Sequence, residues 1–183
     1  MTKSSLNLPS GRAQPGEYAS YGQDDIAFVR GDDIARALAE QCERVLTTLG
    51  GLDDGAVSGL RYAPDKWTLK EVIGHLADDE RIFMYRLLCV LRNDARRLDG
   101  FDEKKYVAAA RFEEQPLDSL LEEYRTVRAA TVALLTGLTP EQWIRRGIVN
   151  GYEASVRGLA YHIAGHELRH LRTIEGRYLA MKA

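Results

Sequence analysis

The sequence has few cysteines, no long apolar run and no excess of charge of either sign. Its two cysteines, Cys42 and Cys89, are too few for a disulfide framework and fit a reducing compartment. The longest apolar runs, such as residues 87–91, span five residues, so no segment is expected to cross a bilayer. The first residues also lack the apolar stretch of a signal peptide. These absences predict a cytoplasmic protein without a membrane partner.

The charge balance argues against a nucleic-acid partner. Lys and Arg total 25 and Asp and Glu total 27, which gives a net charge of −2 and a pI of about 6.1. A protein that binds nucleic acid is expected to carry a basic stripe and a high pI. We therefore expect a small-molecule substrate and no nucleic-acid partner.

The residues that are present have the composition of a globular protein. Of 183 residues, 45% are hydrophobic and 28% are charged. This length corresponds to about one domain, which is large enough to bury a core. Residues 1–30 are rich in Gly, Pro and polar residues and are expected to form an irregular arm. Residues 31–183 are expected to form a single domain.

Helical spacing of apolar residues dominates this domain. The segments with this spacing are 32–49, 68–95, 116–136 and 154–181. Thr68 and Glu71 form a capping box at the second of these helices. Thr139 and Gln142 form another, which predicts a short additional helix. The predicted fold class is all-α, a bundle of four main helices.

The connection between the second and third helices, residues 96–115, is long for a bundle. A helical turn is expected within it at residues 103–110. Further along the chain, Asn150 and Gly151 can form a tight turn, but we predict no sheet there. The expected architecture is a four-helix bundle with a long connection between helices 2 and 3.

All four histidines lie on two of the predicted helices. His162, His166 and His170 are spaced i, i+4 on the fourth helix, which places successive imidazoles one turn apart on one face. At about 100° per residue, His166 and His170 point to the bundle interior and His162 lies at its margin. His75 lies beside the apolar stripe of the second helix. If these helices are neighbours, the histidines can converge on a metal ion.

A site of three histidines with an open position is typical of catalytic zinc, although imidazole also suits Ni, Fe and Mn. Residues 166–170 also match the H-E-x-x-H pattern of zinc proteases. The metzincin extension is missing, because Thr173 and Gly176 stand where a glycine and a third histidine are needed. A di-iron site needs two E-x-x-H pairs, and Glu167 with His170 supplies only one.

Two segments of the chain resemble the DinB/YfiT-like family of metalloenzymes, also called the DinB superfamily. They read KWTLKEVIGHLADDE at 66–80 and YHIAGHELRH at 161–170. The resemblance covers nearly the whole chain from Glu17 onward. It implies a four-helix bundle, often dimeric, with a divalent metal held by one histidine of the second helix and an H-x-x-x-H pair of the last. On this chain these residues are His75, His166 and His170, and His162 has no ligand role.

The resemblance also implies a chemistry. Related members include S-transferases and isomerases that use low-molecular-weight thiols such as bacillithiol or mycothiol. No motif of this chain selects a thiol or a substrate.

Three carboxylates lie on apolar helix faces, where they are costly unless paired. Asp79 and Glu80 lie on the second helix and Glu167 on the fourth. They can orient imidazoles or move protons, or they can form structural ion pairs with an arginine such as Arg86 or Arg92. Glu167 follows a predicted ligand directly, and we predict it as the catalytic proton acceptor.

Two classes of function follow. The first is an enzyme in which a divalent metal (Zn, Ni, Fe or Mn) activates a thiol or water to attack a small electrophile, as in a thiol S-transferase or a hydrolase. The second is a non-catalytic metal-binding or stress-related helical bundle. Family resemblance, together with Leu168 and Leu179 outside the inward stripes, predicts a homodimer.

Overall fold

The computed structural model describes residues 10–181. Residues 1–9 of the expected arm and the last two residues of the expected domain lie outside the described residues. In chain order the elements are η1 (Ser20–Gly22), α1 (Gln23–Ala27), α2 (Ile34–Leu49), α3 (Asp54–Val57), α4 (Leu69–Leu91), α5 (Glu103–Ala110), η2 (Phe112–Glu114), α6 (Leu117–Leu135), α7 (Pro140–Trp143), β1 (Arg146–Val149), β2 (Tyr152–Ser155), α8 (Val156–Thr173), η3 (Ile174–Tyr178) and η4 (Leu179–Met181).

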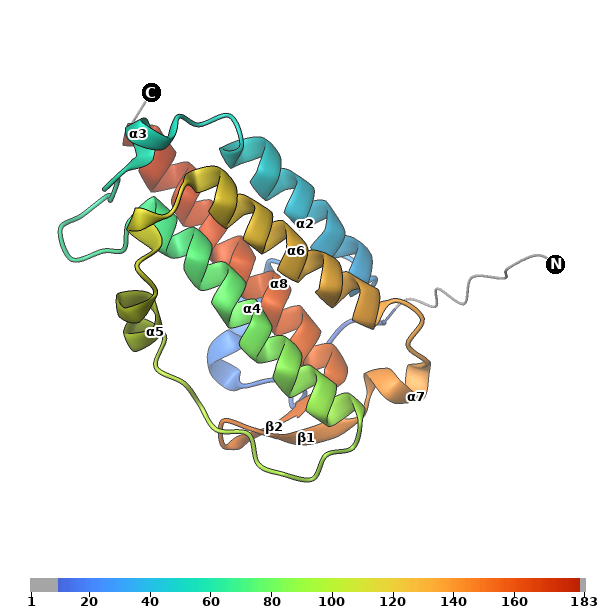
Figure 1. The fold of residues 1–183 in the computed structure, drawn as a ribbon. Helices are drawn as coiled ribbons and strands as arrows, with labels where there is room; N and C mark the ends of the chain where they lie inside the picture. Colours follow the sequence, from blue (N-terminus) through green and yellow to red (C-terminus); the bar gives the residue numbers. More distant parts are fainter. Residues whose placement is uncertain (1–9, 182–183) are drawn as a thin grey trace.

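Four long helices, α2, α4, α6 and α8, form the bundle, which confirms the predicted fold class (Figure 1). Helices α4 and α2 each pack against both α6 and α8. The two helices that carry all the histidines, α4 and α8, are therefore neighbours over much of their length. The histidines can converge only if these two helices are neighbours, and the structure meets this condition.

Local sequence sets where the two histidine-bearing helices begin. In α4 the capping box is formed, because Thr68 Oγ1 accepts from the Glu71 amide at 3.2 Å and Glu71 accepts from the Thr68 amide at 2.7 Å. Helix α8 begins after Ser155, whose hydroxyl accepts from the Gly158 amide at 2.8 Å. These caps fix the position of each helix start and with it the height of each histidine in the bundle.

The expectation of an irregular arm is wrong at residues 20–27, which form η1 and α1 and pack along α8. Two glycines of α8 explain this packing. A Cβ at Gly158 would lie 1.8 Å from the Glu17 carbonyl oxygen, and a Cβ at Gly165 would lie 2.6 Å from the Asp25 carbonyl carbon. These glycines lie about two helical turns apart on one face, so the arm backbone can approach the helix directly.

The long connection and the segment after α7 also hold regular structure. The helical turn predicted at residues 103–110 is confirmed as α5. The prediction of no sheet is wrong, because β1 and β2 form an antiparallel hairpin. Asn150 and Gly151 lie at its tip with φ of 50° and 83°, the positive values of a type I′ turn. A single bridge between Leu98 and Val149 joins the long connection to this hairpin.

A buried polar layer divides the apolar core of the bundle into two clusters. On α4 the residues up to Ala77 belong to one cluster and those from Phe83 onward to the other. On α8 the division falls between Ala164 and Leu171. Asp79 and Glu80 of α4 and His166 and Glu167 of α8 are buried between these limits, and the buried His75 lies two residues before Ala77. These predicted site residues thus lie at about one level of the bundle.

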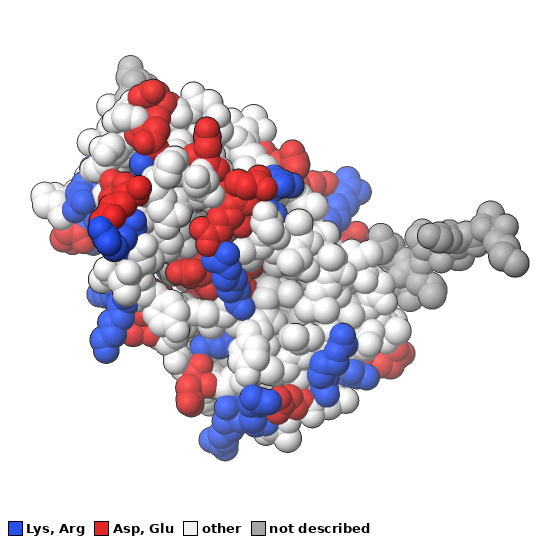
Figure 2. All heavy atoms as spheres, in the orientation of Figure 1, with Lys and Arg blue, Asp and Glu red and all other residues white. Residues whose placement is uncertain are grey.

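The outer surface shows no stripe of a single charge on the face drawn in Figure 2. Acidic and basic side chains are interspersed there, and acidic ones gather toward the α3 end. Within residues 10–181, no helix combines the length and the apolar character needed to cross a membrane.

Candidate metal centre

Three histidines converge between α4 and α8. The Nε2 atom of His166 lies 3.3 Å from Nε2 of His75 and 3.1 Å from Nε2 of His170. One ligand atom from each of the three residues lies within 4.8 Å of the others. His75 and His166 are buried and His170 is partly buried. The three residues that the family resemblance indicated are therefore together in space.

These separations fit a bound metal ion. Two nitrogen ligands at about 2.0–2.1 Å from a tetrahedral zinc ion lie about 3.3 Å apart. The observed separations of 3.3 and 3.1 Å match this value. A set made only of imidazole nitrogens binds zinc and other divalent transition metals, and hard ions such as Mg²⁺ prefer oxygen. The residues fit a single transition-metal ion with an open coordination position.

Asp79 orients His166, the central histidine of the group. Its Oδ2 lies 3.2 Å from Nδ1 of His166, and both side chains are 7% exposed. When Nδ1 donates its proton to the carboxylate, the lone pair of Nε2 is free to face the metal. Burial by itself would raise the pKa of Asp79, but attraction to His166 and this hydrogen bond lower it to about 2. The interpretation of Asp79 as a residue that orients an imidazole agrees with this contact.

Burial keeps the other two histidines neutral. Desolvation, reinforced by the neighbouring His166, lowers the pKa of His75 to about 4. The same two causes lower the pKa of His170 well below its ordinary value. Metal ions bind the neutral form of imidazole. The site can therefore take up metal at neutral pH without first releasing protons from these two ligands.

Aromatic side chains surround the histidines. The Trp67 ring lies 4.8 Å from the His75 ring, and the Tyr178 hydroxyl donates to the Trp67 carbonyl at 2.6 Å. His162 is instead stacked on Phe83, with ring centroids 4.1 Å apart. It does not belong to the group of three converging histidines. Trp67 lies in the loop just before α4, and this loop places its ring beside His75.

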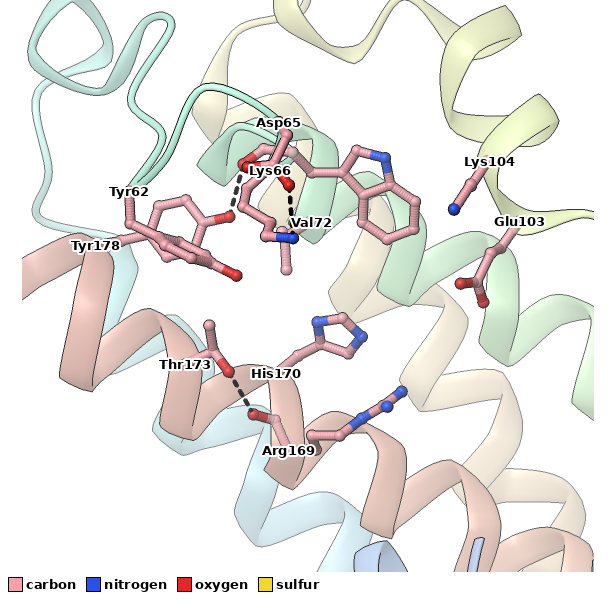
Figure 3. A pocket seen from close by; sticks show the side chains of 11 residues that line it. Tyr62, Asp65, Lys66, Val72, Glu103, Lys104, Arg169, His170, Thr173 and Tyr178 are labelled. Carbon is pink, nitrogen blue, oxygen red and sulfur yellow. Dashed lines mark hydrogen bonds and ion pairs between the residues drawn. The ribbon is translucent and has the colours of Figure 1, made fainter. Parts of the chain in front are cut away.

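Two cavities adjoin the histidines. The His170 cavity, of about 400 Å³, is lined by residues that include Trp67, Glu103, Lys104, Arg169, His170 and Tyr178. Figure 3 shows the His170 imidazole pointing into the space between the segment of Asp65 and Lys66 and helix α5, which carries Glu103 and Lys104. The Arg86 cavity, of about 250 Å³, is lined by residues that include Asp79, Arg86, Phe101, Asn150, His162 and His166. Both cavities also share Glu103 and Arg169.

The long connection explains why sequence reasoning missed part of this lining. Glu103 and Lys104 come from α5, a segment with no apolar stripe that points to the histidines. Arg169 directly precedes the predicted ligand His170, and this position in the sequence is a signal that it lies near the site. Its Nε lies 3.3 Å from Asp25 of α1, so the arm also contributes to the wall.

Glu80 and Glu167 lie in a buried ion cluster behind the histidines. Arg128 of α6 donates from Nη2 to Glu80 at 2.8 Å and also pairs with Glu167. The Tyr124 hydroxyl donates to Glu167 at 2.7 Å. The side chains of Arg128, Glu80 and Glu167 are each 2% exposed. Glu80 therefore pairs with a third-helix arginine and not with Arg86 or Arg92, the partners suggested by sequence proximity.

The contacts of Glu167 differ from those expected of a residue that directly follows the predicted ligand His166. Its side chain points about 100° around the helix from His166, toward α6, because successive residues of a helix face different directions. There its carboxylate is held by Arg128 and Tyr124. Its role as proton acceptor stays a prediction, and these contacts favour a structural role.

Fold and site together define a four-helix bundle in which three histidines from two adjacent helices converge. The sequence profile of the DinB superfamily matches residues 37–174, and the chain belongs to this family. A curated relative from Oceanobacillus iheyensis, named "Putative metal-dependent hydrolase OB0413", is 26% identical over 134 residues, which are 72% of this chain and 76% of that protein.

A solved structure confirms the fold. YfiT from Bacillus subtilis matches with a TM-score of 0.75 and 20% identity, over 97% of this chain and 98% of that one. It is described as a probable metal-dependent hydrolase with an unusual four-helix bundle topology. At this level of identity the match speaks for the fold, and the site rests on the histidines of this chain.

Proposed function

We propose that this protein is a metal-dependent enzyme that activates a water molecule or a low-molecular-weight thiol to attack a small electrophile. The observation that carries the proposal is the convergence of three Nε2 atoms at 3.1 and 3.3 Å from two helices. The names of its relatives, which describe metal-dependent hydrolases, support the same class. We propose His75, His166 and His170 as the ligands.

A divalent metal bound there supplies a Lewis acid that lowers the pKa of a coordinated water or thiol toward neutrality. The residues of this chain hold the histidines in place and leave a path to them. Asp79 holds the His166 ring, and Trp67 packs against the His75 ring. The His170 cavity gives a substrate access to the third ligand. A fourth coordination position that a substrate can reach is typical of a catalytic site, since structural zinc sites are closed by four protein ligands.

Two carboxylates near the histidines are candidates for the proton acceptor. Glu167 is the residue predicted from the sequence, but Arg128 and Tyr124 hold its carboxylate. Glu103 lines both cavities and is the alternative. Removal of a general base costs about 10²–10⁴-fold in rate. We expect this loss, with the metal retained, for Glu103→Gln if Glu103 is the base, and for Glu167→Gln if the sequence prediction is right.

Elemental analysis of protein purified without a nickel column tests the metal centre. We expect one divalent ion per chain, and a sharp loss of metal in His75→Ala, His166→Ala and His170→Ala. His162→Ala is the matched control, because this residue lies on the same helix outside the converging group. Equal loss of metal from all four variants would show that the ligand set is wrong.

A substrate screen tests the reaction. The metal-loaded protein is assayed with thiols against model electrophiles, and with water against simple esters and amides. The proposal requires an activity that is lost both on metal removal and in His166→Ala. Metal binding without any such activity would instead support the non-catalytic metal-binding bundle.

A further inference from the structure

Arg86 is a buried cation beside the candidate metal centre. It lies on α4, three helical turns after His75, and is 4% exposed. Its Nη2 donates to the Asp99 carbonyl at 2.6 Å. Within residues 10–181, no carboxylate oxygen lies within 4.0 Å of its guanidinium nitrogens, whereas Arg128, the other buried arginine, has two carboxylate partners.

A buried guanidinium without a carboxylate is costly, because its hydration is lost and its charge is not balanced. Aromatic rings offset part of this cost. The guanidinium carbon lies 4.8 Å from the Phe83 ring centroid and 5.6 Å from that of Phe101. Such contacts stabilise a cation but leave its hydrogen-bonding capacity unused. Arg86 is therefore poised to accept an anionic partner.

The Arg86 cavity connects this cation to the histidines. His166 and Asp79 line one part of it, and Arg86, Phe101 and Asn150 line another. Its volume of about 250 Å³ suits a molecule smaller than a typical drug-sized ligand. A ligand that fills the cavity would thus reach from Arg86 to a metal ligand.

The charges around the cavity favour a singly charged anion over a doubly charged one. Asp25 pairs with Arg169, and Asp79 is bound to His166. Both carboxylates line the cavity, as does Glu103, and they would repel a dianionic phosphate more strongly than a carboxylate. A planar guanidinium also matches the two oxygens of a carboxylate.

We propose that Arg86 binds a carboxylate of the substrate, so that the substrate is a small monoanion whose reacting bond lies at the histidines. The position of the reacting bond rests on the proposed function. The carboxylate site itself depends only on Arg86 and its cavity. It would select anionic electrophiles over neutral ones of the same size.

The test uses two probes of nearly equal size, monomethyl succinate, which carries one carboxylate, and dimethyl succinate, which is neutral. Each is titrated at pH 7 into dialysed, metal-free, full-length protein and followed by ¹H–¹⁵N NMR. Metal is omitted because a carboxylate can also bind a metal ion directly. We expect the monoanion to bind at least tenfold more tightly, with shifts centred on Asn150 and Phe101. Equal affinities, or shifts centred elsewhere, would overturn the proposal.

Variants then identify the residue. Arg86→Gln should remove the preference for the monoanion, and Arg92→Gln, an exposed arginine on the same stretch of chain, should retain it. If Arg86→Gln does not fold, Arg86→Lys, which keeps the charge, should retain a reduced preference. A preference that survives Arg86→Gln but disappears in Arg169→Gln would assign the anion to Arg169 and refute the proposal.

A parallel zinc titration separates this proposal from the proposed function. Protein that binds no zinc but still prefers the monoanion through Arg86 would retain the carboxylate site and lose the enzyme proposal. Protein that binds zinc at the histidines but shows no preference for the monoanion would refute the carboxylate site and leave the proposed function standing.

Discussion

Replacement of Arg128 by methionine should destabilise the protein severely. The arginine makes hydrogen bonds of 2.8–3.1 Å to Glu80, pairs with Glu167 and donates to the Leu38 carbonyl at 2.8 Å. Methionine fills much of the same space but leaves two carboxylates that are 2% exposed without a counter-charge. Loss of one partner of a buried ion pair costs about 3–5 kcal/mol. This is a large fraction of the ~5–15 kcal/mol by which a typical domain is stable.

Urea unfolding of the metal-free protein at pH 7 measures this loss. Arg36→Met is the control, since Arg36 and its partner Glu40 are 73% and 62% exposed and their pair should contribute little. A triple variant that also carries Glu80→Gln and Glu167→Gln should regain much of the stability, because no buried charge then remains unpaired.

The pH dependence gives a second check. In Arg128→Met two carboxylates stay buried without a counter-charge, and binding a proton removes that unpaired charge. The deficit relative to wild type should therefore shrink as the pH falls and grow as it rises. The reasoning is refuted if Arg128→Met loses no more stability than Arg36→Met, or if its deficit does not change with pH.

Three further predictions concern the site and the assembly. Asp79→Asn should weaken metal affinity about 10–100-fold while leaving the fold intact, because the His166 ring loses its charged partner; titration against a competing chelator measures this. Burial lowers the pKa of His162 to about 4. Between about pH 4 and 6.5 the unfolded chain therefore binds a proton at this residue more readily than the folded chain does. The free energy of unfolding should fall as the pH drops through this window. The shift from 6.5 to about 4 corresponds to about 3 kcal/mol, and this part of the pH dependence of unfolding should be missing in His162→Gln. The homodimer stays a prediction, although Leu168 and Leu179 are partly covered by their own chain; sedimentation that shows a single species of ~20 kDa at micromolar concentration would exclude it.

The helical framework could be predicted from the sequence because its signals are local. Helix spacing and the capping boxes at Thr68 and Thr139 depend on residues three or four positions apart, and both capping boxes are present in the structure. The i, i+4 series of histidines likewise fixes His166 and His170 on one helix face without any knowledge of the fold.

Errors arose where the partner of a segment lies far away in the chain. The arm forms η1 and α1 because Gly158 and Gly165, more than 100 residues later, allow it to approach α8. The hairpin had its turn signal in Asn150 and Gly151, but its strands are too short to show an alternating pattern.

The sequence by itself determined the four main helices, the histidines on their faces and, through family resemblance, the trio of His75, His166 and His170. Only the tertiary structure decided how the neighbouring charges are divided. In the structure Asp79 pairs with His166, and Glu80 and Glu167 pair with Arg128 of a different helix. Arg86 has no carboxylate partner in the described part of the chain. The physical reason is that a helix face can be calculated from spacing, whereas the partner of a buried charge depends on which helices are adjacent and at what height they meet.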